Sequence, residues 1–158
     1  MDLLSAQVGE MLKSRGLVLA TAESCTGGGV AEAVTDIPGS SEWFERGFIT
    51  YANQSKIEML GVSEETLRLH GAVSEAVVRE MAEGALRHSH AHIALAVSGI
   101  AGPGGGTPEK PVGTVCLAWA VQGSPTQSIR IQAPGDREAV RRQAVMAALQ
   151  GILDLLHD

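Results

Sequence analysis

Hydrophobic residues recur along the chain at two different spacings. Leu4, Val8 and Leu12 follow the period of a helix, and Gly16 is a typical residue to end it. Short unbroken apolar runs such as residues 93–97 are instead typical of buried strands. The two patterns predict helices at 4–15, 30–34, 53–60, 63–70, 74–86 and 136–156, and strands at 17–21, 44–51, 92–98, 112–121 and 126–131.

The alternation of these elements predicts the fold class. Strands that alternate with helices favour an α/β fold, and we expect a three-layer α/β/α sandwich with a mixed, mostly parallel sheet. The chain has 158 residues, 44% of them hydrophobic, so it can bury a sizeable core. No shift in composition, repeat or linker divides it, and we expect residues 1–158 to form a single domain.

Composition excludes several classes of partner. The formal net charge is −6, and the basic residues form no cluster beyond Arg141 and Arg142, so nucleic acid is not an expected partner. The first residues lack a basic segment, and no apolar run approaches the ~20 residues of a membrane span. We therefore expect a cytoplasmic protein that has no membrane partner. Two cysteines are too few for a disulfide framework, and reduced thiols are expected.

Three loops rich in small and polar residues follow predicted strands. They cover residues 23–29, 51–56 and 98–111, and the last contains a dense run of glycines. Ligands of α/β sheets bind beyond the carboxyl ends of the strands, so these loops are expected to meet at one site. Glycine lets backbone N–H groups approach a ligand closely, although such a loop can also be a flexible connection. The first turn lacks the Lys-Ser/Thr pair of a Walker A motif and the G-x-G-x-x-G pattern.

Six blocks of sequence follow one another along the chain: TAESCTGG (21–28), GSSEWF (39–44), YAN (51–53), GAVS (71–74), SGIAGP (98–103) and KPVGTV (110–115). In this order they resemble the CinA C-terminal domain family over nearly the whole chain. Members of this family that stand alone are nicotinamide-nucleotide amidohydrolases. The resemblance implies a hydrolase of pyridine nucleotide (NAD) salvage that converts the carboxamide of nicotinamide mononucleotide to nicotinate mononucleotide and ammonia, without a metal or an organic cofactor.

The family pattern implies a Ser-Lys pair in catalysis. Carried over to this chain, it makes Ser41 the nucleophile, Lys56 the base and Tyr51 a proton relay or orienting hydroxyl. A lysine acts as a base only when its pKa falls from ~10.4 toward neutrality, which burial can cause. Taken alone, the same residues suit a turn serine, a solvated helix lysine and a half-buried packing tyrosine.

Further residues are expected to bind the substrate. Glu23 is expected to hold a ribose hydroxyl or to orient Lys56, or else to be a carboxylate favoured by a helix dipole. Arg137 is expected to clamp the phosphate or face the carboxamide, or else to be an exposed helix residue. The full predicted substrate-binding set is Glu23, Ser24, Thr26, Gly27, Ser98, Gly99, Gly102, Gly105 and Arg137.

Alternatives remain for both the chemistry and the function. Cys25 stands where a helix N-terminus could lower a thiol pKa, which makes it a rival nucleophile. His88, His90 and His92 alternate, but they straddle a helix end and a strand start, so no metal site is expected. The alternative functions are a non-catalytic nucleotide-binding or regulatory module and an amidase that acts on a related nucleotide. An edge strand and apolar helix faces favour a homo-oligomer.

Overall fold

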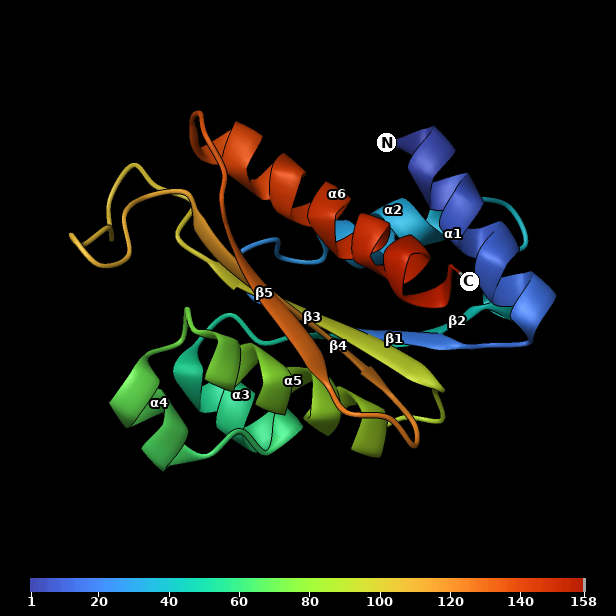
Figure 1. The fold of residues 1–158 in the computed structure, drawn as a ribbon, viewed down its shortest axis with the longest axis horizontal. Helices are drawn as coiled ribbons and strands as arrows, with labels where there is room; N and C mark the ends of the chain where they lie inside the picture. Colours follow the sequence, from blue (N-terminus) through green and yellow to red (C-terminus); the bar gives the residue numbers. More distant parts are fainter. Residues whose placement is uncertain (158) are drawn as a thin grey trace.

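The computed structural model describes residues 1–157, in which a five-stranded sheet lies between two layers of helices (Figure 1). The strand order is β2-β1-β3-β4-β5. The strands are β1 (Leu19–Glu23), β2 (Phe44–Ile49), β3 (Ile93–Gly99), β4 (Thr114–Val121) and β5 (Gln127–Gln132). This arrangement confirms the α/β class and the mixed sheet.

The sheet is less parallel than expected, because two of its four strand pairs are antiparallel. β1 pairs in parallel with both β2 and β3, whereas β3 with β4 and β4 with β5 are antiparallel. The physical reason lies in the connections. A parallel pair needs a long crossover, but residues 100–113 and 122–126 form direct returns that contain no helix.

The helices divide between the two faces of the sheet (Figure 1). On one side lie α1 (Asp2–Arg15), α2 (Gly29–Thr35) and α6 (Arg137–Leu156), and on the other lie α3 (Asn53–Leu60), α4 (Glu64–His70) and α5 (Glu75–Arg87). A short 3-10 turn, η1 (Ser40–Glu42), precedes β2. All the predicted helices and strands are present. The largest differences are at α1, β1, β2 and β4, where an end shifts by about two residues, the ordinary precision of helix and strand ends.

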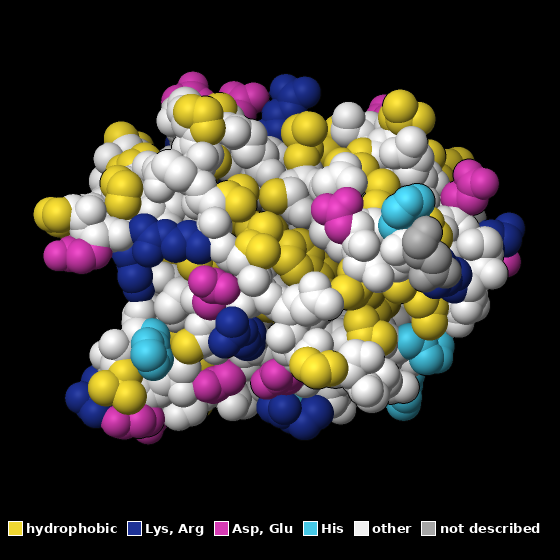
Figure 2. All heavy atoms as spheres, in the orientation of Figure 1, with side chains coloured by type: hydrophobic (Ala, Val, Ile, Leu, Met, Phe, Trp, Pro, Cys, Tyr) yellow, Lys and Arg dark blue, Asp and Glu magenta, His cyan; other side chains and the backbone are white. Residues whose placement is uncertain are grey.

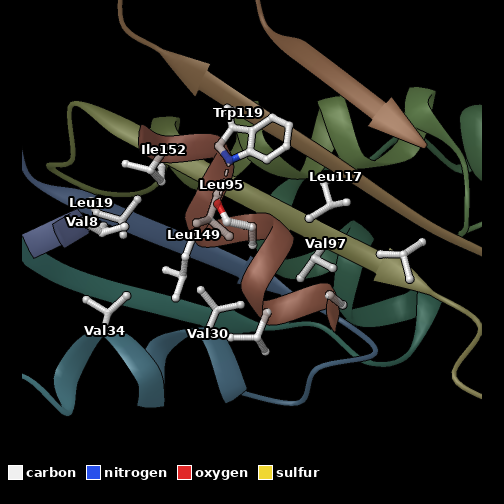
Figure 3. Close-up of a cluster of buried hydrophobic side chains, with 14 of the residues drawn as sticks. Val8, Leu19, Val30, Val34, Leu95, Val97, Leu117, Trp119, Leu149 and Ile152 are labelled. Carbon is white, nitrogen blue, oxygen red and sulfur yellow. Dashed lines mark hydrogen bonds between the residues drawn. The ribbon is translucent and has the colours of Figure 1, made fainter. Parts of the chain in front are cut away.

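The two faces of the sheet carry side chains of different size. In β3, Leu95 and Val97 face the layer of α1, α2 and α6, while Ala94 and Ala96 face α5. Figure 3 shows the first cluster, in which the Trp119 indole donates to the Ala148 carbonyl at 3.1 Å. The small alanines leave room for α5 to pack closely on the sheet.

Predicted start and stop residues set several helix ends. The Ser74 hydroxyl accepts from the Val77 amide at 3.2 Å and begins α5, and Asp136 accepts from Ala139 at 2.9 Å at the start of α6. Gly16 ends α1 with a φ of 65°, a left-handed conformation that glycine adopts without strain. Among the described residues, no helix is long and apolar enough to cross a membrane.

Candidate active site

The three predicted loops meet at the carboxyl ends of β1, β2 and β3. They border a cavity of about 190 Å³, which also touches the connection between α4 and α5 and the first residue of α6. The topology explains the meeting, because these three adjacent strands run parallel and end at the same edge. The lining residues are Ser24, Cys25, Tyr51, Asn53, Lys56, Ala72, Val73, Ser98, Gly99, Ala101 and Arg137.

Lys56 is the ionisable centre of this cavity. It lies one turn into α3 and is only 1% exposed. Its Nζ atom donates to Ser24 Oγ at 3.0 Å, to the Thr50 carbonyl at 2.8 Å and to the Tyr51 carbonyl at 3.1 Å. Burial lowers the pKa of Lys56 because it disfavours the charged ammonium. The predicted requirement for a desolvated lysine is therefore met by the structure.

Ser24 is held in place by the turn that follows β1. Its amide donates to the Val97 carbonyl at 3.0 Å, and its own carbonyl accepts from the Gly27 amide at 3.1 Å. Gly27 and Gly28 have φ values of 58° and 105°, which permit this tight turn into α2. The hydroxyl is thereby fixed opposite Lys56.

Ser41 does not line this cavity, so the structure does not bring the predicted pair of Ser41 and Lys56 together. It is exposed in η1, just before β2, whereas Lys56 follows the far end of that strand. Six residues of β2, about 20 Å of extended chain, separate the two edges of the sheet. The structure brings Ser24 to Lys56 instead. The sequence signal for this contact was the position of Ser24 directly after a buried strand and before a glycine turn.

Glu23 performs the structural role that was weighed as the alternative. Its buried carboxylate accepts from Thr26 Oγ1 at 2.5 Å and from the amides of Gly28, Val30 and Ala31 at 3.2, 2.9 and 3.0 Å. These donors belong to the turn and first residues of α2, where a negative charge is favourable. The Thr26 hydroxyl donates to the same carboxylate, while ribose binding by Glu23 and its orientation of Lys56 stay predictions.

Tyr51 and Arg137 lie together in the lining of the cavity. Arg137 donates from Nη2 to the Tyr51 hydroxyl at 3.2 Å and from Nη1 to the Gly102 carbonyl at 2.8 Å. The Tyr51 side chain is 61% exposed, and it is the backbone carbonyl of Tyr51, not its hydroxyl, that contacts Lys56. The pair thus links β2, the glycine-rich loop and α6 around one opening.

Ser98 is an unpaired hydroxyl in the lining of the cavity. It is 1% exposed, and its Oγ has no hydrogen-bond partner among the described residues. A buried polar group without a partner is costly, so this hydroxyl is available to a ligand in the cavity. Gly99 lines the cavity beside it, whereas Gly105 lies in the exposed outer part of the loop, outside the lining.

Two residues of the site region were missed by the sequence analysis. Asn53 lines the cavity as the first residue of α3. Arg141 donates from Nε to the Cys25 carbonyl at 3.0 Å and from Nη2 to the Thr26 carbonyl at 3.4 Å, and so supports the turn that carries Ser24. The Arg141-Arg142 pair was visible in the sequence, but the direction in which the Arg141 side chain points depends on how α6 packs.

Cys25 is present in the cavity lining but is chemically unsuited to be the nucleophile. Burial raises the pKa of its thiol to about 11, so the thiolate is scarce near neutral pH. The alternating histidines are engaged elsewhere, since His92 Nδ1 accepts from the Val18 amide at 3.0 Å and His88 Nδ1 contacts the Gly84 carbonyl. In residues 1–157, no group of three His, Cys, Asp or Glu side chains is arranged to hold a metal.

Comparison with known proteins finds relatives that match nearly the whole chain. The chain is 60% identical over 147 residues to the nicotinamide-nucleotide amidohydrolase PncC of Escherichia coli K12, which covers 93% of this chain and 89% of that protein. It is 56% identical over 152 residues to the protein of the same name from Pseudomonas putida, covering 96% and 94%. The solved structure of the competence/damage inducible protein CihA from Agrobacterium tumefaciens is 44% identical, with a TM-score of 0.95 over 99% of this chain and 95% of that one.

The family is shown by the extent of the match as well as by these relatives. The model of the CinA C-terminal domain matches residues 1–156, which include every residue that lines the cavity. The chain belongs to the CinA C-terminal domain family.

Proposed function

We propose that this chain is a nicotinamide-nucleotide amidohydrolase that converts nicotinamide mononucleotide and water to nicotinate mononucleotide and ammonia. Relatives that carry this name match nearly the whole chain at 55% to 60% identity. The observation that carries the proposal is the 3.0 Å contact between the buried Lys56 Nζ and Ser24 Oγ in a cavity at the end of the sheet.

Lys56 can act as a base once it is deprotonated. In the structure, Nζ donates to the carbonyls of Thr50 and Tyr51 and to Ser24 Oγ, whereas a neutral lysine has two N–H donors and one lone pair. In the neutral form the two carbonyls keep the donors, and the lone pair faces Ser24 Oγ, which then donates its proton to Nζ. Since burial lowers the lysine pKa, the deprotonated form needed for this step is accessible.

The reaction then proceeds by acyl transfer. Ser24 Oγ attacks the carboxamide carbon while Nζ takes the hydroxyl proton, and the carbonyl oxygen becomes an oxyanion. The Lys56 ammonium returns this proton to the departing nitrogen, which leaves as ammonia as the C–N bond breaks. Water, deprotonated by Lys56, next attacks the ester carbon. Ser24 Oγ leaves and takes the proton back from Lys56 as nicotinate mononucleotide is released.

Ser98 supplies a donor to the substrate in this scheme. Its unpaired buried hydroxyl lines the same cavity as Ser24, so it is placed to donate to the carboxamide oxygen as negative charge develops there. Arg137 and the Tyr51 hydroxyl border the cavity together and orient the pyridine nucleotide. Donors fixed in a buried cavity are effective because water does not compete with them.

Ammonia release from nicotinamide mononucleotide tests the proposal. The wild-type protein is compared with Ser24→Ala, Ser41→Ala and Cys25→Ala. We expect turnover in the wild type, Ser41→Ala and Cys25→Ala, and a loss of at least about a hundredfold in Ser24→Ala. Binding of the nucleotide without turnover by the wild type would contradict the proposal and favour the non-catalytic module. Turnover lost with Ser41 or Cys25 would overturn the assignment of Ser24.

We also propose that the enzyme is a cytoplasmic homo-oligomer. β2 forms one edge of the sheet, and Ile49 at its end is exposed, which suits contact with a second copy. The free thiols of Cys25 and Cys116 suit a reducing compartment. Sedimentation of the purified protein and fractionation of the cells that make it test these two points, and a monomer or an exported protein would contradict them.

A further inference from the structure

The catalytic cavity is too small for a whole nucleoside monophosphate. Its volume is about 190 Å³, whereas cavities that hold small molecules measure roughly 300–1,000 Å³. The carboxamide and the pyridine ring must lie near Ser24 for the reaction proposed above. The ribose and the phosphate therefore extend beyond the catalytic cavity, and the next cavity along their path is the place to look for a phosphate site.

A larger cavity adjoins the catalytic one. It measures about 540 Å³ and lies between the end of α4, the start of α5 and the outer strands of the sheet. Val73 lines both cavities, with Ala72 on the catalytic side and Ser74 on the other. The lining of this second cavity, named here the α4–α5 cavity, consists of Leu69, His70, Val73, Ser74, Glu75, Ala76, Arg79, Lys110, Cys116 and Arg130.

The α4–α5 cavity is basic, although the chain as a whole carries a net charge of −6. Three cations and one carboxylate line it. Arg130 donates from Nη2 to the Glu109 carbonyl at 2.6 Å, and Arg79 donates from Nε to Ser128 Oγ at 2.7 Å. Lys110 Nζ donates to the His70 carbonyl. Figure 2 shows Lys and Arg side chains gathered around a hollow at the left of the molecule.

The carboxylate in this cavity is already engaged. Glu75 Oε1 accepts from Ser128 Oγ at 2.8 Å and lies 3.7 Å from Arg79 Nη2. The cavity therefore keeps an excess of positive charge. Arg130 uses one of its three nitrogens in the contact with Glu109, so the rest of its guanidinium can bind an anion.

The sheet register sets the distance between the two cavities. Ser98 pairs with Cys116, and Cys116 pairs with Arg130, so the three residues form one row across β3, β4 and β5. Paired residues point to the same face, and two strand spacings amount to about 10 Å. At one end of this row is the unpaired Ser98 hydroxyl, which lines the catalytic cavity, and at the other is the Arg130 guanidinium.

We propose that the α4–α5 cavity binds the 5′-phosphate of the substrate, a phosphomonoester dianion, through Arg130, Arg79 and Lys110. The proposal rests on the proposed amidohydrolase function, because it takes the position of the carboxamide at Ser24 as given. The first residues of α5 line the same cavity, where the helix dipole also favours an anion. Arg137, by contrast, lines the catalytic cavity and is engaged with Tyr51 and Gly102.

Kinetics with and without the phosphate test the site. Ammonia release is measured from nicotinamide mononucleotide and from nicotinamide riboside, which lacks the phosphate, for the wild type, Arg130→Gln and Arg79→Gln. Arg68→Gln is the matched control, since Arg68 is an exposed α4 arginine paired with Glu65 outside the cavity. We expect KM for the mononucleotide to rise about tenfold in the two cavity variants, the energy of one charge-assisted contact, with kcat nearly unchanged. KM and kcat for nicotinamide riboside should be the same in the variants as in the wild type.

Two results would overturn the phosphate site. One is an unchanged KM for the mononucleotide in both cavity variants, and the other is an equal rise of KM for both substrates. A titration of the wild type and Arg130→Gln with ribose 5-phosphate gives a readout that needs no turnover, and Arg130→Gln is expected to bind about tenfold more weakly. If the wild type hydrolyses neither substrate, the amidohydrolase function fails, while this titration still decides whether the cavity binds a phosphomonoester. Equal binding by both proteins would reject the site.

Discussion

Lys56, the proposed base, is buried, and the activity of the enzyme is expected to depend on pH in a defined direction. Burial lowers the pKa of Lys56, and only the deprotonated amine can accept the Ser24 proton. We expect kcat/KM to rise with pH as Lys56 loses its proton and to level off below ~10.4, the ordinary lysine pKa. Lys56→Arg keeps the charge but cannot deprotonate, so it should lose at least about a hundredfold at every pH.

The pH profile of ammonia release checks this expectation. A profile that stays flat across the range, or a Lys56→Arg enzyme with near-normal turnover, would contradict the role of Lys56 as the base. Ser41→Ala serves as the control, because it removes a serine hydroxyl at the opposite edge of the sheet. It should leave both the rising part and the plateau of the pH profile unchanged.

The catalytic residues show what sequence could and could not predict at this scale. The resemblance and the chemistry of amide hydrolysis identified Lys56, Tyr51 and the loop that carries Ser24, all of which line the cavity. The choice between Ser24 and Ser41 depended on which edge of the sheet each serine occupies. Both serines suit turns, so only the parallel pairing of β1 with β2 separates them. The amide donors that surround the Glu23 carboxylate likewise depend on packing, which the sequence does not show.

At the scale of single elements, α2 depends on the carboxylate before it. Glu23 accepts four hydrogen bonds from the turn and the first residues of this seven-residue helix, and a helix so short is unstable alone. Glu23→Gln keeps the shape but loses the charge and places an N–H₂ against amide donors. We expect a loss of about 2 kcal/mol in the free energy of unfolding, measured with urea.

Glu23→Asp and the kinetics complete that test. Aspartate keeps the charge on a shorter side chain, so it should recover part of the lost stability. An unchanged midpoint of urea unfolding in Glu23→Gln would show that the carboxylate does not stabilise α2. A rise of KM without any loss of stability would return Glu23 to the substrate site.

The packing of α5 on α3 predicts a specific effect of one glycine. A Cβ at Gly84 would lie 1.9 Å from the Leu60 carbonyl oxygen, so Gly84→Ala must push the two helices apart. Such overpacking costs roughly 1–3 kcal/mol, and we expect a loss in that range by urea unfolding. Gly104→Ala is the matched control, because a Cβ there meets no atom within 4 Å, and its stability should stay near that of the wild type. Equal stability of the two variants would contradict the close contact.

Most elements could be predicted because hydrophobic spacing is a local signal. Helices such as α1 and α5 matched their expected positions, and Gly16 and Ser74 marked their ends. Strand direction is not local. The apolar runs of β3 and β4 look alike in the sequence, and only the absence of a crossover helix in the loop between them makes the pair antiparallel. That is why the sheet is less parallel than predicted.

At the scale of the whole molecule, the catalytic cavity draws on segments from Ser24 to Arg137, which join both helix layers to the sheet. A ligand there contacts several elements at once, so its binding energy should stabilise the complete fold. We expect one cooperative unfolding transition for the chain, as for a single domain. In Ser24→Ala, which binds without turnover, saturation with nicotinamide mononucleotide at a hundred times Kd should add about 2.7 kcal/mol and move the transition upward without splitting it.

Scanning calorimetry of Ser24→Ala with and without the nucleotide measures both features. Nicotinamide riboside gives the comparison, since without its phosphate it should bind more weakly and shift the transition less at equal concentration. Two separate transitions in the free protein would show that the chain unfolds as more than one unit. If only one of two transitions moved with the nucleotide, the site would belong to that unit alone. A single transition that rises with the nucleotide ties the site to the whole sheet, because the loops that form it are held by strands at its centre and by helices on both of its faces.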